Sequence, residues 1–341
     1  MMTAVPTDTQ SDLRLQALTL WAQQVLTDVD LQIAPASADA SFRRYFRIRR
    51  GHDSFIAMDA PPDKEDVRPF LHVAGLLQGA GVHVPQVIAE DVANGYLLLS
   101  DLGTQTYLDV LNEDNAHDLF MAAIEALIKS QSASTPDVFP PYDAALLRRE
   151  LQLFPDWYIA KHLQIELSDA QRTTLARMFD LIIDTNLAQA SVYVHRDYMP
   201  RNLMISTPNP GVLDFQDAVY GPISYDVASL FRDAFISWPE ARVIDWVARY
   251  WQQAREAGLP VPTDFGQFYR DVEWMGLQRH LKVLGIFARI NYRDGKPKYL
   301  ADTPRFMTYV RHAAQRYDEL RPLLKLLNEL EGKQAQVGYT F

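Results

Sequence analysis

The chain contains no cysteine among its 341 residues. This absence excludes disulfide scaffolds, cysteine nucleophiles, cysteine-ligated zinc sites and iron–sulfur clusters. The sequence also lacks a run of about eighteen consecutive apolar residues, which a membrane-spanning helix needs. No basic segment followed by an apolar one stands at the N-terminus, so nothing there has the pattern of a secretory signal. These absences predict a cytoplasmic protein without a membrane partner.

Positive charge is also in short supply. Lys and Arg together number 33 and Asp and Glu number 43, which gives a net charge of −10. An acidic protein has no general attraction for DNA, RNA or anionic lipid, so we expect no nucleic acid partner. The sequence points to no particular protein partner. A negatively charged substrate would need local positive groups or a metal ion to offset this background.

The residue pattern divides the chain into a β-rich part and a helical part. The β-rich part contains, in order, a helix from about residue 11, strands at 31–37, 42–50 and 54–60, a helix at 66–77, and strands at 84–92 and 96–100. Helical periodicity then covers 115–133, 143–163, 168–189, 224–236, 240–257, 266–290 and 304–330. We therefore predict an α+β fold: an N-lobe over 1–101, with a leading helix and a five-stranded antiparallel sheet, and a helical C-lobe over 102–341.

One stretch carries a chemical motif. His195, Arg196, Asp197 and Asn202 match H-R-D-x-x-x-x-N, the catalytic loop of kinases, and Asp214 ends an apolar strand where a kinase places its metal-binding Asp. Phosphoryl transfer needs one carboxylate to orient the acceptor hydroxyl and take its proton. It also needs a carboxylate and an amide oxygen to hold Mg²⁺. Asp197 fits the first role, and Asn202 and Asp214 fit the second. Turn capping is the competing interpretation, and the two segments in order weigh against it.

Three further segments bear on the interpretation of this motif. We expect His195 to support the loop through hydrogen bonds rather than to act as a base. Asp264-Phe265-Gly266 spells D-F-G, but it opens a helical run, where Asp caps the N-terminus. Trp238-Pro239-Glu240 resembles the A-P-E signature of protein kinases, yet the apolar residues at 227–235 repeat as a helix face. That leaves no room for an activation segment, so we expect no protein substrate.

The chain resembles the aminoglycoside phosphotransferase and choline kinase superfamily, which are small-molecule kinases with a bilobal, protein-kinase-like fold. Within it, the chain is closer to the anomeric sugar kinases that phosphorylate N-acetylmuramate and N-acetylglucosamine at C1 in bacterial cell-wall recycling. This resemblance spans about residues 30–255, and the segments that carry it are Ser41–Arg47, His195–Tyr198, Leu203–Met204, Leu213–Ala218 and Tyr225–Asp233. It implies ATP and Mg²⁺ as cofactors and a small-molecule amino sugar as substrate.

The resemblance also implies roles for individual residues. Asp226 would be buried and brace the catalytic loop. The turn over 38–44 would cover the ATP phosphates, and backbone groups near the end of the last N-terminal strand would contact the adenine. The nucleotide-binding residues implied in this way are Ser41, Arg43, Arg44, Leu98, Ser100 and Asp101. For Asp101, a plain turn residue is an equally good interpretation.

The third strand departs from the kinase pattern. Kinases carry a phosphate-binding Lys in V-A-I-K, where this strand has Phe55-Ile56-Ala57-Met58. Methionine cannot donate a hydrogen bond to phosphate, so Arg43, Arg44 or Lys64 would have to supply the charge, and we favour Arg44. The alternative is that these three are solvated charges at a strand edge. Loss of the Lys also leaves open a non-catalytic nucleotide-binding module.

The acceptor pocket is expected in the helical part. Sugar sites combine an aromatic face with charged hydrogen-bonding groups, and an Arg could bind a carboxylate on the sugar. The candidates are Glu150, Trp157, Arg232 and Asp233. By contrast, Leu151, Phe154 and Tyr158 repeat at helical spacing and are assigned to the core. A kinase for a different small hydroxyl acceptor, of the aminoglycoside, choline or homoserine type, is the main alternative.

Overall fold

The computed structural model describes residues 9–37 and 42–332. The chain forms two compact units, which are described separately. The first unit comprises the residues up to Val110 together with Asn202–Asp217, and the second comprises Leu111–Arg201 and the residues from Ala218 onward. These limits differ from the lobe boundary predicted after Asp101. The assignment of nucleotide binding to the N-lobe and of acceptor binding to the C-lobe stays a prediction.

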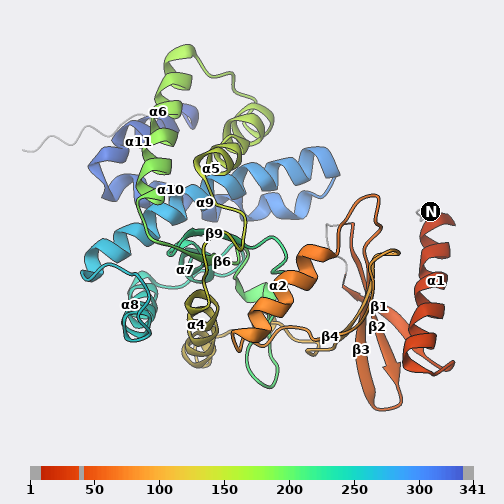
Figure 1. Cartoon of the computed structure of the whole chain (residues 1–341). Coiled ribbons are helices and arrows are strands. Elements are labelled where there is room, and N and C mark those ends of the chain that lie inside the picture. Colours follow the sequence, from red (N-terminus) through yellow and green to blue (C-terminus); the bar gives the residue numbers. More distant parts are fainter. Residues whose placement is uncertain (1–8, 38–41, 333–341) are drawn as a thin grey trace, which may run out of the picture. The chain divides into compact units, whose positions relative to one another are not determined.

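A five-stranded antiparallel sheet forms the centre of the first unit (Figure 1). Its strands are, in spatial order, β1 (Gln32–Ser37), β2 (Arg44–Arg50), β3 (Asp53–Asp59), β5 (Tyr96–Ser100) and β4 (Val87–Asp91). The turn between β4 and β5 contains Gly95 at φ +73°, where a Cβ would lie 1.9 Å from the carbonyl oxygen of Ala60. Glycine alone fits this turn. The predicted five-stranded sheet is confirmed.

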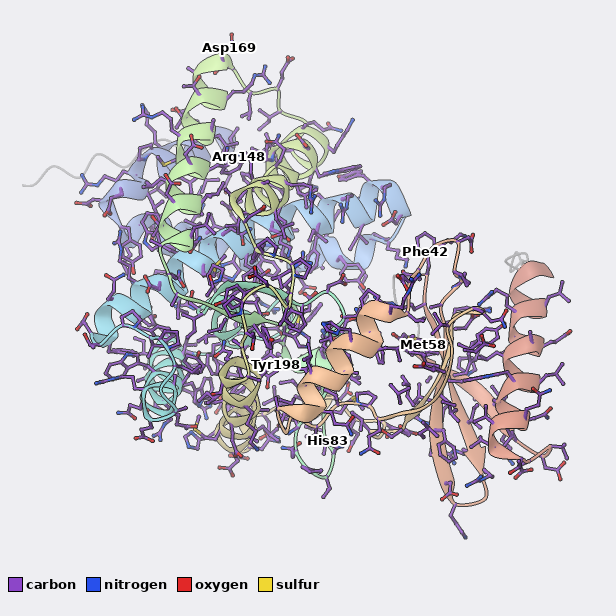
Figure 2. The ribbon with its side chains drawn as sticks, viewed as in Figure 1. Phe42, Met58, His83, Arg148, Asp169 and Tyr198 are labelled. Atoms are coloured by element: carbon purple, nitrogen blue, oxygen red, sulfur yellow. The ribbon has the colours of Figure 1, made fainter. Side chains whose placement is uncertain are left out.

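Helix α1 (Thr9–Leu26) covers one face of this sheet (Figure 1). Side chains alternate between the two faces of a strand, so Phe46 and Ile48 face α1 while Arg47 lies on the opposite face. Met58, labelled in Figure 2, also belongs to the opposite face, because its neighbour Ala57 packs in the α1 core. That core consists of Leu18, Ala22, Leu26, Phe46, Ile48, Ala57, Tyr96 and Leu98.

Two short helices and a small hairpin complete the first unit. Helix α2 (Arg68–Gly79) has Pro in its first turn and buries one apolar face, and α3 (Tyr107–Val110) is a single turn. Strand β7 (Leu203–Met204) pairs antiparallel with β8 (Gly211–Val212). This hairpin brings the segments before β7 and after β8 together, and those segments carry the motif residues predicted to bind metal.

The second unit is mainly helical. Its helices are α4 (Ala116–Ser132), α5 (Ala144–Leu151), η1 (Phe154–His162), α6 (Asp169–Leu187), α7 (Tyr225–Phe231), α8 (Glu240–Glu256), α9 (Phe265–Asp294), η3 (Pro297–Asp302), α10 (Thr303–Arg316), η4 (Asp318–Leu320) and α11 (Arg321–Leu330). Strands β6 (Ser191–Val194) and β9 (Val219–Pro222) form an antiparallel pair within it. Helix α9 is the longest, with 30 residues, and it is buried along most of its length. The predicted helical C-terminal part is confirmed.

Three predicted helices are shorter than expected. The run over 143–163 is α5 followed by η1, a π-helical segment, because Pro155 in its first turn has no N–H to donate. Helix α7 ends at Phe231, since Arg232 leaves the helical region at φ −119° and ψ 56°. The run over 304–330 is interrupted at Tyr317, which is extended, before α11 begins with Pro in its first turn. In the part of the chain that the structure describes, no helix has the length and apolarity needed to cross a bilayer.

Candidate active site

A buried carboxylate holds the loop that follows β6. Asp226, at the start of α7, is fully buried and accepts hydrogen bonds from the backbone N–H groups of His195 at 2.7 Å and Arg196 at 3.0 Å. Burial raises the pKa of Asp226 to about 6, while His195 and the two backbone N–H groups act against that rise. The motif loop is therefore fixed to α7 through its backbone, as the bracing role of Asp226 requires.

Side chains within the loop add further support. Arg196 has a positive φ of 74°, a conformation that non-glycine residues adopt mainly where surrounding contacts impose it. His195 Nδ1 accepts a hydrogen bond from the backbone N–H of Asp197 at 3.3 Å. Tyr198 packs edge-on against the His195 ring, and its hydroxyl donates to the carbonyl of Ala123 in α4 at 2.7 Å. These contacts leave the Asp197 side chain partly exposed on an ordered loop.

The β7–β8 hairpin brings together Asn202 and Asp214 in the first unit. Asn202 Nδ2 lies 3.4 Å from Asp214 Oδ2, and the N–H of Leu213 donates to the carbonyl of Asn202 at 2.9 Å. Asp214 has a positive φ of 64°. Phe215 is fully buried, and its ring centroid lies 4.8 Å from that of Phe70 in α2. The second motif segment is therefore anchored by the residue after its carboxylate.

The chemistry of this pair suits magnesium. The Asp214 side chain is exposed, and an Asn amide oxygen is also a hard oxygen ligand. No cluster of three or more His, Cys, Asp or Glu side chains that could hold a metal ion occurs within residues 9–37 and 42–332. Mg²⁺ is commonly bound by one or two protein groups together with waters and substrate phosphates, so a full protein cage is not required.

The predicted phosphate-binding arginine is engaged on the α1 face of the sheet. Asp59 of β3 is fully buried and lies between two guanidinium groups: Arg14 of α1, whose Nε donates to Oδ1 at 2.9 Å, and Arg44, whose Nε donates to Oδ2 at 3.0 Å. Met58 lies on the opposite face, where it pairs with Tyr45 of β2. A side chain cannot serve both faces of a strand. For Arg44 to bind phosphate beside Met58, it would have to leave Asp59.

Other cations near β2 lie differently. Arg43 immediately precedes β2, in which Tyr45 pairs with Met58. From continuation of the strand alternation by one residue we infer that Arg43 belongs to the face of Met58. The Lys64 ammonium lies 5.0 Å from the centroid of the exposed Phe42 ring. Ser41 lies outside the described residues, so the turn over 38–44 is described only from Phe42 onward.

The end of β5 is tied into the sheet. Leu98 pairs with both β3 and β4, and its side chain lies in the α1 core. The N–H of Ser100 donates to the carbonyl of Gln86 at 2.9 Å. A nucleotide role for these two residues stays a prediction.

Asp101 is held by the strand next to it. Its carboxylate accepts hydrogen bonds from Arg47 Nε at 2.6 Å, from the Ser54 hydroxyl and from the N–H of Gly103 at 3.0 Å. Burial alone would raise the pKa of Asp101, but these three donors outweigh burial and hold the pKa below its ordinary value. The turn interpretation of Asp101 fits these contacts, since the carboxylate organises the segment that follows β5.

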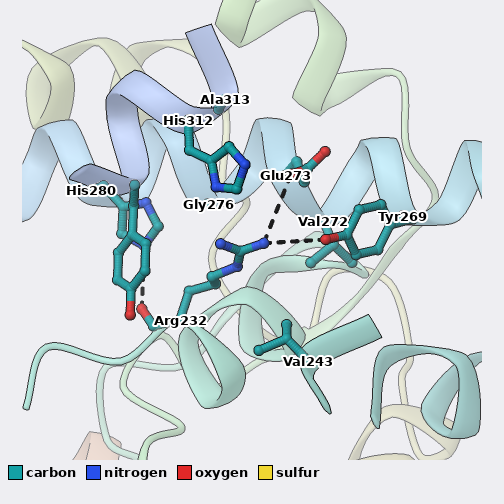
Figure 3. Close-up of a pocket in the computed structure, with 10 residues that line it drawn as sticks. Arg232, Val243, Tyr269, Val272, Glu273, Gly276, His280, His312 and Ala313 are labelled. Carbon is teal, nitrogen blue, oxygen red and sulfur yellow. Dashed lines mark hydrogen bonds and ion pairs between the residues drawn. The ribbon is translucent and has the colours of Figure 1, made fainter. Parts of the chain in front are cut away.

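Two of the predicted acceptor residues have intramolecular partners. Glu150 of α5 is buried and accepts a hydrogen bond from Arg196 of the motif loop at 2.6 Å. Arg232 points into a small pocket between α8, α9 and α10, where its Nη2 lies 3.2 Å from the Tyr269 hydroxyl and 3.8 Å from Glu273 (Figure 3). Their contact with an acceptor stays a prediction.

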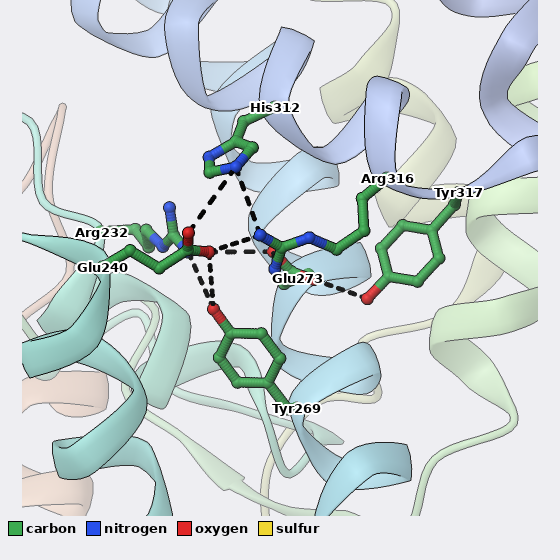
Figure 4. A network of polar contacts seen from close by, with 7 residues as sticks. All are labelled: Arg232, Glu240, Tyr269, Glu273, His312, Arg316 and Tyr317. Atoms are coloured by element: carbon green, nitrogen blue, oxygen red, sulfur yellow. Dashed lines mark hydrogen bonds and ion pairs between the residues drawn. The ribbon is translucent and has the colours of Figure 1, made fainter.

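The pocket around Arg232 opens onto a larger network of charges. Arg316 of α10 bridges Glu240 and Glu273, at 2.5 Å and 2.7 Å, while His312 lies 3.8 Å from Glu240 (Figure 4). Tyr317 donates to Glu273 from the end of α10. This network links α8, α9 and α10 to Arg232, the residue that follows α7.

Asp233 has a different environment. It is buried, and its Oδ2 accepts a hydrogen bond from the N–H of Phe235 at 3.2 Å. Burial raises the pKa of Asp233, while the nearby Arg279 acts against that rise. Arg279 also contacts the motif loop, because its Nη2 lies 3.8 Å from Met199 Sδ. Trp157 of η1 is half-buried.

Residues of α9 were missed by the sequence interpretation. Arg279 is buried beside the motif loop, and Lys282 is buried with its Nζ 3.0 Å from Glu150. The sequence signal was that α9 contains charged residues among apolar residues on all of its faces. A helix that is buried on all sides must bury its charged side chains as well. Two other assignments are confirmed. Leu151, Phe154 and Tyr158 are buried, and Asp264 caps α9 by accepting from the N–H of Gln267.

Comparison with known proteins gives the family. A sequence model described as the phosphotransferase enzyme family matches residues 32–264. The chain is 54% identical over 332 residues to the N-acetylmuramate/N-acetylglucosamine kinase of Pseudomonas putida, covering 94% of this chain and 98% of the relative. Among solved structures, a Plasmodium vivax ethanolamine kinase superimposes with a TM-score of 0.65 at 9% identity, covering 90% of this chain and 91% of that one. An ADP-bound aminoglycoside phosphotransferase gives 0.58 at 12% identity, covering 86% and 97%.

Proposed function

Because the chain belongs to the phosphotransferase enzyme family, we propose that it transfers the γ-phosphoryl group of ATP to the anomeric hydroxyl of N-acetylmuramate and N-acetylglucosamine. The observation that supports phosphoryl transfer is the H-R-D loop, whose backbone is held by the buried Asp226 carboxylate. The name and 54% identity of the Pseudomonas putida relative support the acceptor. The structural likenesses support the kinase-like fold alone.

In the proposed mechanism, Asp197 orients the C1 hydroxyl and accepts its proton. The C1 oxygen forms a bond to the γ-phosphorus as the bond from that phosphorus to the β,γ-bridging oxygen breaks, which leaves ADP and a sugar 1-phosphate. The ordered loop keeps the Asp197 carboxylate in place, so little geometry has to be gained at the moment of transfer. Asn202 and Asp214 would hold Mg²⁺, which offsets charge on the phosphate oxygens when bound.

The nucleotide would be bound by the first unit. We assign its phosphates to the turn over 38–44, with Ser41, Arg43 and Arg44 as the predicted side chains. Arg43 has the better position of the two arginines, because it shares the face of Met58. Backbone groups from Leu98 to Asp101 are proposed to lie near the adenine. The absent lysine also suggests a non-catalytic nucleotide-binding module, which measured turnover would exclude.

The acceptor would be bound near the motif loop. Trp157, which is half-buried, is the predicted residue that keeps this role most simply. Glu150, Arg232 and the buried Asp233 would take it only by exchanging their present partners. A small-molecule amino sugar is the proposed partner, with no nucleic acid or membrane partner. The cytoplasmic location expected from the sequence stays a prediction.

ATP consumption across an acceptor panel tests this proposal. The panel contains N-acetylmuramate, N-acetylglucosamine, choline, homoserine and an aminoglycoside, and the 1-O-methyl glycoside of N-acetylglucosamine is the matched control. We expect turnover with the two free amino sugars and none with the methyl glycoside, whose anomeric oxygen is blocked. Turnover confined to choline, homoserine or the aminoglycoside would overturn the sugar assignment. Binding of ATP without turnover on any acceptor would support the non-catalytic module.

A further inference from the structure

A cluster of buried charged side chains contacts the motif loop within the second unit. Glu150 of α5 is at its centre, and both of its carboxylate oxygens have partners. Oε1 lies 2.6 Å from Arg196 Nη2 and 3.0 Å from Lys282 Nζ. Oε2 accepts from Gln278 Nε2 at 3.2 Å and from the Tyr142 hydroxyl. One carboxylate thus joins α5 and α9 to the loop.

The members of the cluster are charged despite their burial. Glu150 is 5% exposed and Lys282 is 8% exposed. Burial alone would raise the pKa of Glu150, but Lys282 and Arg196 outweigh it and hold the pKa at about 2. Burial would lower the pKa of Lys282, yet Tyr225, Glu150 and Asp197 act against it and keep the pKa above its ordinary value. Each charge is stable there only because its partners are present.

The cluster acts on the residue that precedes Asp197. Arg196 is held at both ends, because its backbone N–H donates to Asp226 and its guanidinium donates to Glu150. Its φ of 74° is an unfavourable backbone conformation for a residue other than glycine, and the hydrogen bonds to these two carboxylates help to offset that cost. Asp197 follows directly, so the side-chain anchor at Glu150 limits how far the Asp197 carboxylate can move. Lys282 also lies close enough to Asp197 to interact with it electrostatically.

We propose that Glu150 and Lys282 are positioning residues for phosphoryl transfer. Glu150 fixes Asp197 through Arg196, and Lys282 balances the negative charges of Glu150 and Asp197. This inference rests on the proposed kinase function of the same loop. It gives Glu150 a role different from the acceptor contact predicted from the sequence.

The test is the Glu150→Gln variant, which keeps the shape of the side chain and removes its charge. We expect kcat to fall about 100-fold, the size of effect that a misplacement of about 1 Å can cause, while KM for ATP and for the sugar stays within about twofold. Glu125→Gln, an exposed acid-to-amide change in α4, is the matched control and should leave kcat unchanged. A rise in the sugar KM larger than the fall in kcat would overturn the proposal and place Glu150 at the acceptor.

Lys282→Met supplies the second arm. Alone it leaves Glu150 paired with Arg196, so we expect a smaller fall in kcat than in Glu150→Gln. In Glu150→Gln the Lys282 ammonium loses its carboxylate partner. Adding Lys282→Met removes this unpaired cation, so kcat of the double variant should be higher than kcat of Glu150→Gln. If the two losses in kcat simply multiply, the residues act independently and the proposal fails. Should Glu150→Gln not fold, Lys282→Met is judged by the same split between kcat and KM.

A measurement without turnover separates this inference from the proposed function. Amide hydrogen exchange of the peptide over 194–199 should be faster in Glu150→Gln than in the wild-type protein, because the loop loses one of its two anchors. Unchanged exchange in a folded variant would overturn the positioning role. An inactive wild-type protein whose variant still shows faster loop exchange would instead refute the kinase function and leave the anchoring intact.

Discussion

In the motif loop and in the sheet of the first unit, buried carboxylates hold arginine side chains, with different consequences for the proposed site. In the loop, two buried carboxylates, Asp226 and Glu150, hold the backbone and the side chain of Arg196. In the sheet, one buried carboxylate, Asp59, holds two arginines on the face away from Met58. The first arrangement orders residues next to Asp197. The second engages Arg44, a positive group that the sequence predicts at the ATP phosphates.

The difference shows what a buried carboxylate does to neighbouring cations. An ion pair inside the protein fixes geometry, and the fixed group is then less available to a ligand. Fixing Arg196 would favour the proposed phosphoryl transfer, because Asp197 follows it in the chain. Fixing Arg44 does not favour phosphate binding, so the phosphate charge must be offset by other groups, for which Arg43 and Mg²⁺ are our candidates.

The largest effect is expected at the loop. Asp197→Ala removes the group proposed to take the acceptor proton, so kcat should fall by about 10³-fold or more. The dissociation constant for ATP should stay within about twofold, because Asp197 belongs to the second unit and is proposed to contact the acceptor. Turnover assays and calorimetric titration with ATP measure the two quantities. A variant with near wild-type kcat would remove Asp197 from the mechanism.

A smaller effect is expected at the metal pair, and the chain offers a matched control. Asp214→Ala should weaken Mg²⁺-dependent ATP binding by about 10²-fold, since one hard oxygen ligand is lost. Asp264→Ala changes another Asp that precedes Phe, but its carboxylate caps α9. That variant should lower stability by about 1 kcal/mol and leave the Mg²⁺ dependence unchanged. Equal Mg²⁺ titrations for the wild-type protein and Asp214→Ala would contradict the assignment.

The pH dependence of the loop follows from Asp226. Its folded-state pKa of about 6 is above its ordinary value of 3.8, because the group is buried. Below pH 6 the Asp226 carboxyl protonates, and one of its two hydrogen bonds from the backbone N–H groups of the loop weakens. The loop that carries Asp197 is then held less firmly, so kcat should fall between pH 7 and pH 5. Because the folded protein binds this proton more tightly than the unfolded chain, protonation of Asp226 stabilises the fold. This contribution to the free energy of unfolding is largest below pH 3.8 and is lost as the pH rises through 6. Activity and this part of the stability therefore change in opposite directions.

The matched variant for this prediction is Asp226→Asn, which cannot titrate. The difference in unfolding free energy between the wild-type protein and Asp226→Asn should change over pH 4–6.5, and the variant should lose the acid limb of kcat near pH 6. Denaturant unfolding and pH–rate profiles measure both. A wild-type kcat that stays constant from pH 7 to pH 5 would contradict this account of the loop.

The smallest effects separate the two neighbouring arginines. Arg43→Ala should raise the KM for ATP about tenfold, the value of one charge-assisted hydrogen bond. Arg44→Ala should leave that KM nearly unchanged and lower stability by about 2 kcal/mol, because Asp59 would keep only Arg14. Steady-state kinetics and thermal unfolding give the two readings. The reverse pattern would restore Arg44 as the phosphate-binding residue.

Local patterns in the sequence were enough to predict the fold and the motif. Strand alternation gave the five-stranded sheet, and the spacing of Asp197, Asn202 and Asp214 identified the kinase motif. Side-chain pairing between distant segments was not predictable in the same way. The two cations that pair with Glu150, Arg196 and Lys282, lie 46 and 132 positions further along the chain, and nothing near Glu150 in the sequence indicates them.

The face on which a strand residue lies explains the other difference. Arg43, Arg44 and Lys64 are equivalent as charges in the sequence, and the choice between them depends on which strand residues face α1. That choice is decided by the packing of Phe46 and Ile48 against α1. The register between β2 and β3 then pairs Arg44 with Asp59 and Tyr45 with Met58. Composition and motif spacing contain no information on this register.

Phosphorus NMR of the product formed from N-acetylglucosamine and ATP shows which sugar oxygen carries the phosphate. We expect one sugar phosphate, in amount equal to the ADP released, whose phosphorus couples to the anomeric proton. The same sample prepared with Asp197→Ala should show only ATP. A phosphate on any other sugar oxygen, or ADP released without a sugar phosphate from the wild-type protein, would contradict the claim that this chain is a kinase of the anomeric hydroxyl.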